Sequence, residues 1–278
     1  MALLRSPLAA PIGQHHRVDL RHSRIPVAAH AKHADKAGGI YIGCSGWAYT
    51  SWKPDFYPST LSSKKFLEYY ATRLNSVEVN YTFRSLPSES TIKNWLDTAG
   101  HAFRFSFKAP QRITHLSRLK NCRDALEAFA RSIAPAQQAN RLGVILFQLP
   151  PNMKADLERL DSFLKDAAST DLAAGLRMAF EFRHESWFAD PTYSLLQEHS
   201  VALCVAESDE LTTPDVQTAP FSCYRLRKSV YSEDDLDAIR RNLHARSSEG
   251  DVFAYFKHEE EPDGALRATA VLERLQQP

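Results

Sequence analysis

Polar side chains in this chain recur in pairs two positions apart, each pair at the end of a short apolar run. The pairs are Glu78 with Asn80, Glu181 with Arg183, and Arg225 with Arg227. Alternate residues of an extended strand point to the same side, so the two members of each pair share a face. The residue between them is apolar in every case. This pattern predicts that the polar members point into the fold, where a charge is costly unless it is paired or used.

The chemistry of these residues suits an anionic substrate. Arginine forks bind carboxylate or phosphate oxygens through two parallel hydrogen bonds, and lysine adds a compact positive charge. We predict Glu181 and Glu78 as the catalytic acid/base residues. The predicted substrate-binding residues lie at the ends of apolar runs or directly after them. They are Trp47, Tyr49, Asn80, Lys108, Gln148, Arg183, Trp187 and Arg225. The alternative is that Glu181, Arg183 and Arg225 form a buried salt-bridge network with a purely structural role in the core.

Eight β-rich runs could carry these residues. They are Ile40 to Cys44, Ser76 to Asn80, Phe103 to Lys108, Gly143 to Leu149, Met178 to Arg183, Val201 to Glu207, Phe221 to Arg227, and Val252 to Lys257. Helical patterns fill the gaps at about 63–74, 89–98, 121–140, 154–168, 191–199, 233–246 and 264–276, and the gap at 208–220 predicts no full helix. Ser88, Asp190 and Ser232 are the predicted helix caps.

Strand–helix alternation of this kind is typical of a parallel sheet, because parallel neighbours need crossover connections. We therefore predict an α/β fold, a single (β/α)8 TIM-type barrel over residues 39–278, with the chemistry where strands end and βα loops begin. An open doubly wound sheet is less favoured, since the turn after the first run lacks a glycine-rich phosphate loop.

Residues 1–38 differ in composition from the rest. They hold five of the eleven histidines and only two acids, Asp19 and Asp35. We predict a disordered tail or a misplaced start, with an organellar transit segment as the alternative. The four cysteines form no CxxC pair, which favours a reducing, cytoplasmic location over a disulfide framework.

Other functions receive less support. The net charge of +1 gives a nucleic-acid binder no global support, although the segment from Arg104 to Arg131 is locally basic. That segment leaves a nucleic-acid-associated or metal-dependent, nuclease-like barrel as the alternative function. Glu181, Glu207, Asp209, His184 and His258 could converge on a divalent metal, but the support is weak because no tight ligand spacing appears. We therefore assign no metal ligands and leave the cofactor undefined. No apolar run is long enough to span a membrane.

Several motifs, taken in order, resemble the YecE-like family, known as domain of unknown function 72. They are Gly43-Cys44-Ser45-Gly46-Trp47-Ala48-Tyr49, Glu78-Val79-Asn80, Phe105-Ser106-Phe107-Lys108, Gln148-Leu149-Pro150-Pro151 and Glu181-Phe182-Arg183-His184-Glu185-Ser186-Trp187. The chain departs from the family pattern at Arg227-Lys228 and at Lys257-His258. The resemblance implies a TIM-type barrel without an established activity. A hydrolase or a lyase/isomerase-type enzyme with an anion-binding pocket is the function we expect, with the substrate undefined.

Overall fold

The computed structural model describes residues 37–170, 176–209, 211–257 and 261–276. The predicted tail therefore lies outside the described residues, except for its last two. His258 also lies outside them.

Eight parallel strands form one sheet, in the order β1-β8-β7-β6-β5-β4-β3-β2, which confirms the predicted barrel. The strands are β1 (Ile40–Cys44), β2 (Ser76–Val79), β3 (Arg104–Lys108), β4 (Leu142–Gln148), β5 (Arg177–Glu181), β6 (Ala202–Glu207), β7 (Phe221–Leu226) and β8 (Asp251–Phe256). All seven residues of β4 are buried, as expected for a strand covered on both faces.

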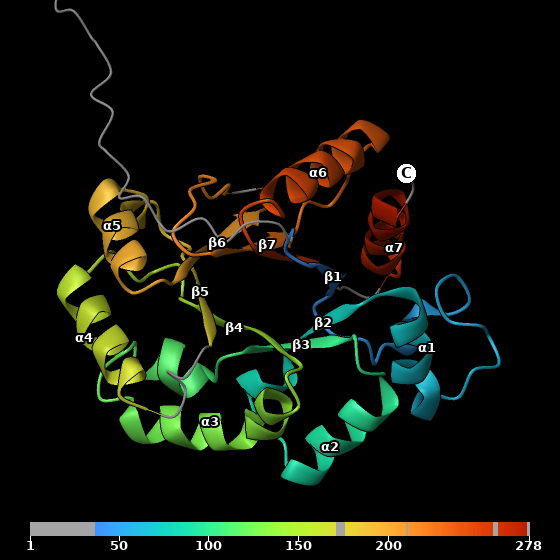
Figure 1. The fold of residues 1–278 in the computed structure, drawn as a ribbon, viewed down its shortest axis with the longest axis horizontal. Helices are drawn as coiled ribbons and strands as arrows, with labels where there is room; N and C mark the ends of the chain where they lie inside the picture. Colours follow the sequence, from blue (N-terminus) through green and yellow to red (C-terminus); the bar gives the residue numbers. More distant parts are fainter. Residues whose placement is uncertain (1–36, 171–175, 210, 258–260, 277–278) are drawn as a thin grey trace, which may run out of the picture. The chain divides into compact units, whose positions relative to one another are not determined.

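Helices surround the strands (Figure 1). They are α1 (Phe66–Arg73), α2 (Glu89–Thr98), α3 (Arg123–Gln138), α4 (Leu157–Ala168), α5 (Asp190–Glu198), α6 (Glu233–Arg246) and α7 (Asp263–Gln276). No helix occurs among the described residues between β6 and β7, as predicted. Ser88 and Ser232 cap α2 and α6, but the Asp190 prediction is wrong, because Ala189 precedes α5 without a side-chain cap.

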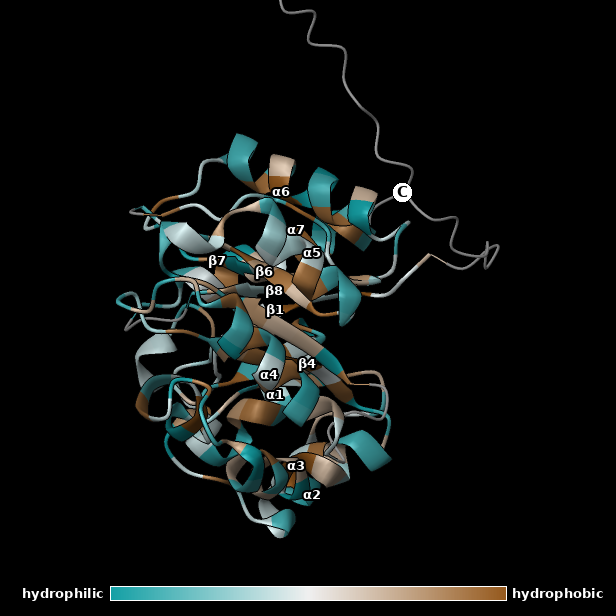
Figure 2. Cartoon of the chain, turned by 90° about the vertical axis from the view of Figure 1, so that its left-hand side faces the viewer, coloured by the Kyte–Doolittle hydropathy of each residue, from teal (hydrophilic) through white to brown (hydrophobic). Residues whose placement is uncertain are grey.

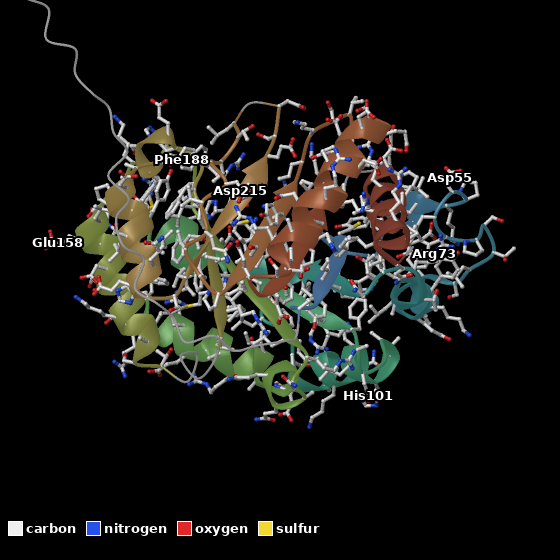
Figure 3. All side chains as sticks on the ribbon, turned by 45° about the horizontal axis from the view of Figure 1, so that its top comes forward. Asp55, Arg73, His101, Glu158, Phe188 and Asp215 are labelled. Atoms are coloured by element: carbon white, nitrogen blue, oxygen red, sulfur yellow. The ribbon has the colours of Figure 1, made fainter. Side chains whose placement is uncertain are left out.

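The helices are amphipathic, as covering elements must be. In Figure 2 the outward side of α6 is mostly hydrophilic, and its hydrophobic residues lie toward the strands. Exposed side chains such as Arg73, His101 and Glu158 stand at the periphery of the barrel in Figure 3. None of the described helices is both long and apolar enough to cross a membrane.

The barrel closes between β1 and β2 through side chains. Asn75 accepts a hydrogen bond from the Ile42 N–H (2.7 Å) and donates one to the Ile40 carbonyl (2.8 Å), so its amide replaces a strand partner. The Tyr70 hydroxyl accepts from the Cys44 N–H (2.7 Å) and donates to the Ser76 carbonyl (3.0 Å). A Cβ on Gly43 would lie 1.9 Å from the Ser76 oxygen, so only glycine allows this close approach.

This closure predicts a stability effect for Asn75→Ala. The change removes the partners of one backbone N–H and one carbonyl, so the free energy of unfolding should fall by roughly 1–3 kcal/mol. Urea denaturation measures it, with Asn94→Ala on the exposed face of α2 as the matched control. Equal stabilities of the two variants would contradict a role for Asn75 in closure.

The barrel interior below the C-terminal strand ends is filled. An apolar cluster there includes Val144, Leu146, Ala179 and Phe253. The Tyr255 hydroxyl is hydrogen-bonded to Ser106 (2.5 Å) and Ser76 (2.8 Å). Because side chains occupy the centre, the rim where the strands end is the place in this fold where a barrel ligand is expected.

Candidate functional site

An ionic triad lies inside the barrel at its C-terminal end. Glu78 comes from β2, Glu181 from β5 and Arg225 from β7, and each is at most 2% exposed. Arg225 Nε and Nη2 donate to the two oxygens of Glu78 at 2.9 and 2.6 Å. Arg225 Nη1 donates to Glu181 Oε2. The buried arginine thus holds both carboxylates at once.

The triad is fully ionised. Burial opposes ionisation of Glu78 and Glu181, but the charge and hydrogen bonds of Arg225 outweigh it and hold the pKa of both carboxyls below the usual range. Burial also opposes the charge on Arg225, yet the two carboxylates raise its pKa well above its ordinary value. Two negative charges and one positive charge leave the triad with a net charge of −1.

A hydrogen-bonded chain leads from the triad to Lys108. Gln148 Nε2 donates to Glu181 Oε1 at 2.8 Å, and Lys108 Nζ donates to Gln148 Oε1 at 2.8 Å. The ring of Phe83 lies 4.2 Å from Lys108 Nζ, which favours the ammonium form. Burial, followed by the charge of Arg225, lowers the pKa of Lys108 to about 8. The pKa of Lys108 is therefore close to neutral pH, so the ammonium group can lose its proton there.

Three further basic groups lie around Lys108. Arg227 is half-buried directly after β7, and its buried Nη1 has no hydrogen-bond partner among the described residues. Burial, then the charge of Arg225, lowers the pKa of Arg227. Burial also lowers the pKa of His115, as do the charges of Lys108 and Arg183. Arg225 binds both triad carboxylates, so these carboxylates form no ion pair with the positively charged groups around Lys108.

The position of Arg183 corrects the sequence interpretation. We predicted that Arg183 shares the inward face of its strand with Glu181, but β5 ends at Glu181 and Arg183 is exposed. The alternation of faces does not continue beyond the strand. Arg225 takes the place beside Glu181, and no ion pair of Arg183 is found in the described part of the chain.

Tyr49, in the loop after β1, and Asn80, directly after β2, meet at the edge of the triad. Tyr49 donates its hydroxyl hydrogen to the Ser45 carbonyl (3.2 Å), and Asn80 Nδ2 donates to the same oxygen at 3.4 Å. Burial, with the nearby Cys44 and Glu78, raises the pKa of Tyr49 to about 12. Asn80 Oδ1 is buried without a partner in the described structure. Both residues therefore meet at the Ser45 carbonyl near Glu78, and their role in substrate binding stays a prediction.

Of the two predicted tryptophans, Trp187 lies in the core, whereas substrate binding by Trp47 stays a prediction. Trp187 is fully buried, stacks on Phe182 (4.4 Å between ring centroids) and donates its indole N–H to the Met153 carbonyl at 2.8 Å. The Trp187 ring and its indole N–H therefore both make contacts within the core, and no part of the ring is exposed to a substrate. Trp47 packs edge-on against Trp95 of α2 (5.2 Å) and is partly buried.

Sequence reasoning placed neither Phe83 nor His115 in the site. Phe83 lies in the short helix Tyr81–Phe83 after β2, and its ring contacts the His115 ring at 5.0 Å. His115 lies in Arg112–Leu116, within the segment that we interpreted as basic surface. Loop residues carry no periodic pattern, so only their position after a strand could have indicated them.

The predicted alternatives are weakened by the arrangement of their residues. Within residues 37–276, leaving out the undescribed gaps, no three His, Cys, Asp or Glu side chains are placed to hold a metal. Glu207 instead pairs with Lys228. In the basic segment, Arg104 begins β3 at the opposite end from Lys108, and Arg123 and Arg131 both pair with Glu127, which reduces the positive charge that a nucleic acid could use.

The chain resembles known proteins along most of its length. Residues 41–278 match the family model described as "Protein of unknown function DUF72". The UPF0759 protein YecE of Escherichia coli is 32% identical over 151 residues, 54% of this chain and 50% of that protein. The UPF0759 protein YunF of Bacillus subtilis is 28% identical over 158 residues, 55% of this chain and 54% of that protein. The chain thus spans about half the length of these curated relatives.

Solved structures share the fold. A DUF72 family protein from Thermotoga maritima has a TM-score of 0.76 at 24% identity, with 86% of this chain and 100% of that chain covered. A sugar phosphate isomerase/epimerase from Parabacteroides distasonis has a TM-score of 0.52 at 12% identity, with 91% and 99% covered. At these identities the similarity concerns the fold alone.

Proposed function

Because the chain belongs to the DUF72 family, whose description names no reaction, we propose a function from the site itself: an enzyme that binds a small carboxylate- or phosphate-bearing substrate at the barrel rim and acts on it by proton transfer. The observation that carries the proposal is the unpaired positive charge around Lys108. Arg225 pairs with both triad carboxylates, whereas Arg227 Nη1 is buried without a hydrogen-bond partner in the described residues. A buried donor of this kind is costly unless a ligand satisfies it.

Each residue has a role in this proposal. Arg227 and Arg183 hold the anion, since guanidinium forks match carboxylate and phosphate oxygens. Lys108 is the acid/base group, because a catalytic pKa works best near the operating pH and that of Lys108 is lowered to about 8. This revises the assignment of Glu78 and Glu181, whose lowered pKa values suit fixed anions that position Arg225. Asn80 and Tyr49 orient the substrate beside Glu78.

A nucleic-acid partner is the less favoured use of the same charge. Phosphate contacts along a strand need basic residues spread over a continuous surface. The rim cluster is compact and partly buried, which suits a small anion. Sugar phosphates belong among the probes, since a phosphate can engage the arginines while a hydroxyl or carbonyl group faces Lys108.

Calorimetric titration with inorganic phosphate, malate and glucose 6-phosphate tests the proposal. Arg227→Gln should weaken binding about 10- to 100-fold, because a charge-assisted hydrogen bond contributes roughly 1.5–3 kcal/mol. Arg131→Gln, at an exposed position on α3, is the matched control and should bind as the wild type does. Equal weakening in both variants, or no binding of any probe, would reject the site.

The same titration should depend on pH. An anion prefers protonated Lys108, so affinity should fall as the pH rises through about 8. In Lys108→Met this fall should disappear and the affinity should be uniformly low. A pH profile unchanged by Lys108→Met would exclude the lysine from the anion site.

A further inference from the structure

We propose that Lys108 is a nucleophile that forms an imine with the carbonyl carbon of an anionic ketone or aldehyde. This inference rests on the proposed function, because the same arginines must hold the anionic group of that substrate. It adds covalent chemistry to the proposed site and narrows the substrate to compounds that carry both a carbonyl and an acid group.

The surroundings of the amine differ from those of two surface lysines in helices. Lys93 and Lys165 each pair with a carboxylate one helical turn away. In the described part of the chain no carboxylate forms an ion pair with Lys108, whose hydrogen-bond acceptor is the neutral amide oxygen of Gln148. An ion-paired lysine is held in its protonated form, whereas an amide acceptor also tolerates the free amine.

The position of Lys108 fits a nucleophile as well. It is the last residue of β3, half-buried at the end of the barrel where chemistry occurs in this fold. Burial and the charge of Arg225 lower its pKa to about 8, so the nucleophilic free amine is available near neutral pH. The Phe83 ring opposes this by favouring the ammonium, and it also covers one side of the nitrogen.

The proposed step balances without an external oxidant or reductant. The amine lone pair of Lys108 forms an N–C bond to the carbonyl carbon, and the carbonyl electron pair moves to oxygen, which takes a proton. That first proton comes from solvent. One of the two nitrogen hydrogens then moves as a proton to the resulting hydroxyl group, the C–O bond breaks, and the oxygen leaves as water. The nitrogen keeps one hydrogen and the positive charge of an iminium ion.

Groups next to Lys108 support both the departure of water and the formation of the iminium ion. The rings of His115 and Phe83 are in contact, and Phe83 also contacts Lys108 Nζ. Burial, followed by the charge of Lys108, lowers the pKa of His115, so its neutral imidazole can take the proton from the nitrogen and pass it to the departing oxygen. The triad, with its net charge of −1, faces the iminium nitrogen across Gln148. A fixed negative charge beside the developing cation stabilises it.

Reductive trapping tests the proposal. The full chain is incubated with cyanoborohydride and either pyruvate, which presents a carboxylate, or dihydroxyacetone phosphate, which presents a phosphate. Intact mass and peptide mapping should show one adduct per chain, on Lys108, with at least one of the two probes. The probe that reacts identifies the anionic group. Lys108→Arg keeps the charge but should lose this adduct, whereas Lys165→Arg on α4 should retain it.

The outcomes separate this inference from the proposed function. Calorimetric binding of the probes without an adduct on Lys108 would overturn the imine and leave the anion site standing. Adducts spread over surface lysines, unchanged in Lys108→Arg, would also overturn it. An adduct on Lys108 that excess inorganic phosphate does not block would keep the imine and reject the shared anion site. Absence of both binding and adduct would reject both.

Discussion

Arg225→Met is expected to lower the free energy of unfolding by about 3–5 kcal/mol, because it leaves Glu78 and Glu181 as buried charges without their partner. The methionine keeps much of the side-chain volume, so the loss reports on charge more than on packing. Chemical denaturation near pH 7 gives the value.

Arg183→Met is the control for this measurement. Arg183 is exposed and has no ion pair in the described chain, so its loss should change stability by no more than about 0.5 kcal/mol while weakening binding of inorganic phosphate. A triple change, Glu78→Gln with Glu181→Gln and Arg225→Met, removes every charge of the triad. It should recover part of the lost stability, since uncharged replacements of a whole buried network are often tolerated.

The stability difference should also depend on pH. The pKa values of Glu78 and Glu181 are lowered in the fold, so the contribution of the triad is complete above the unfolded value of 4.5 and is lost as the pH falls toward the folded values. Wild type and Arg225→Met should therefore converge in acid. A small effect of Arg225→Met at pH 7, equal to that of Arg183→Met, would contradict the triad.

Trp187→Ala is expected to cost a similar amount, about 3–5 kcal/mol. The change empties a buried site beside Phe182 and leaves the Met153 carbonyl without the indole N–H. Thermal or chemical denaturation measures the loss.

Two further variants serve as controls for Trp187→Ala. Trp187→Phe keeps the ring stack and should cost less than Trp187→Ala. Tyr81→Ala, at an aromatic side chain that is 55% exposed, should leave stability nearly unchanged. If Trp187→Ala instead kept its stability and lost only anion binding, the prediction of a substrate-binding tryptophan would be right and its assignment to the core wrong.

The sequence determined the elements and the end of the barrel at which the polar residues gather. Apolar runs separated by helical patterns predicted all eight strands to within two residues. Parallel strands all end at the same rim, so Glu78, Lys108, Gln148, Glu181 and Arg225 were placed together without knowledge of any contact. These signals are local, because a strand's alternation and a helix's period are each visible in a short window.

Which of these residues contact one another depends on the three-dimensional packing of the barrel. Arg225 pairs with carboxylates from β2 and β5, which are far from it in the chain. Arg183 is displaced outward because β5 ends two residues earlier, and Trp187 turns into the core beside Phe182. Asn75 acts as a strand partner because β1 and β2 close the barrel. Partners of this kind depend on barrel closure and on where each strand stops, which long-range packing sets and no local pattern records.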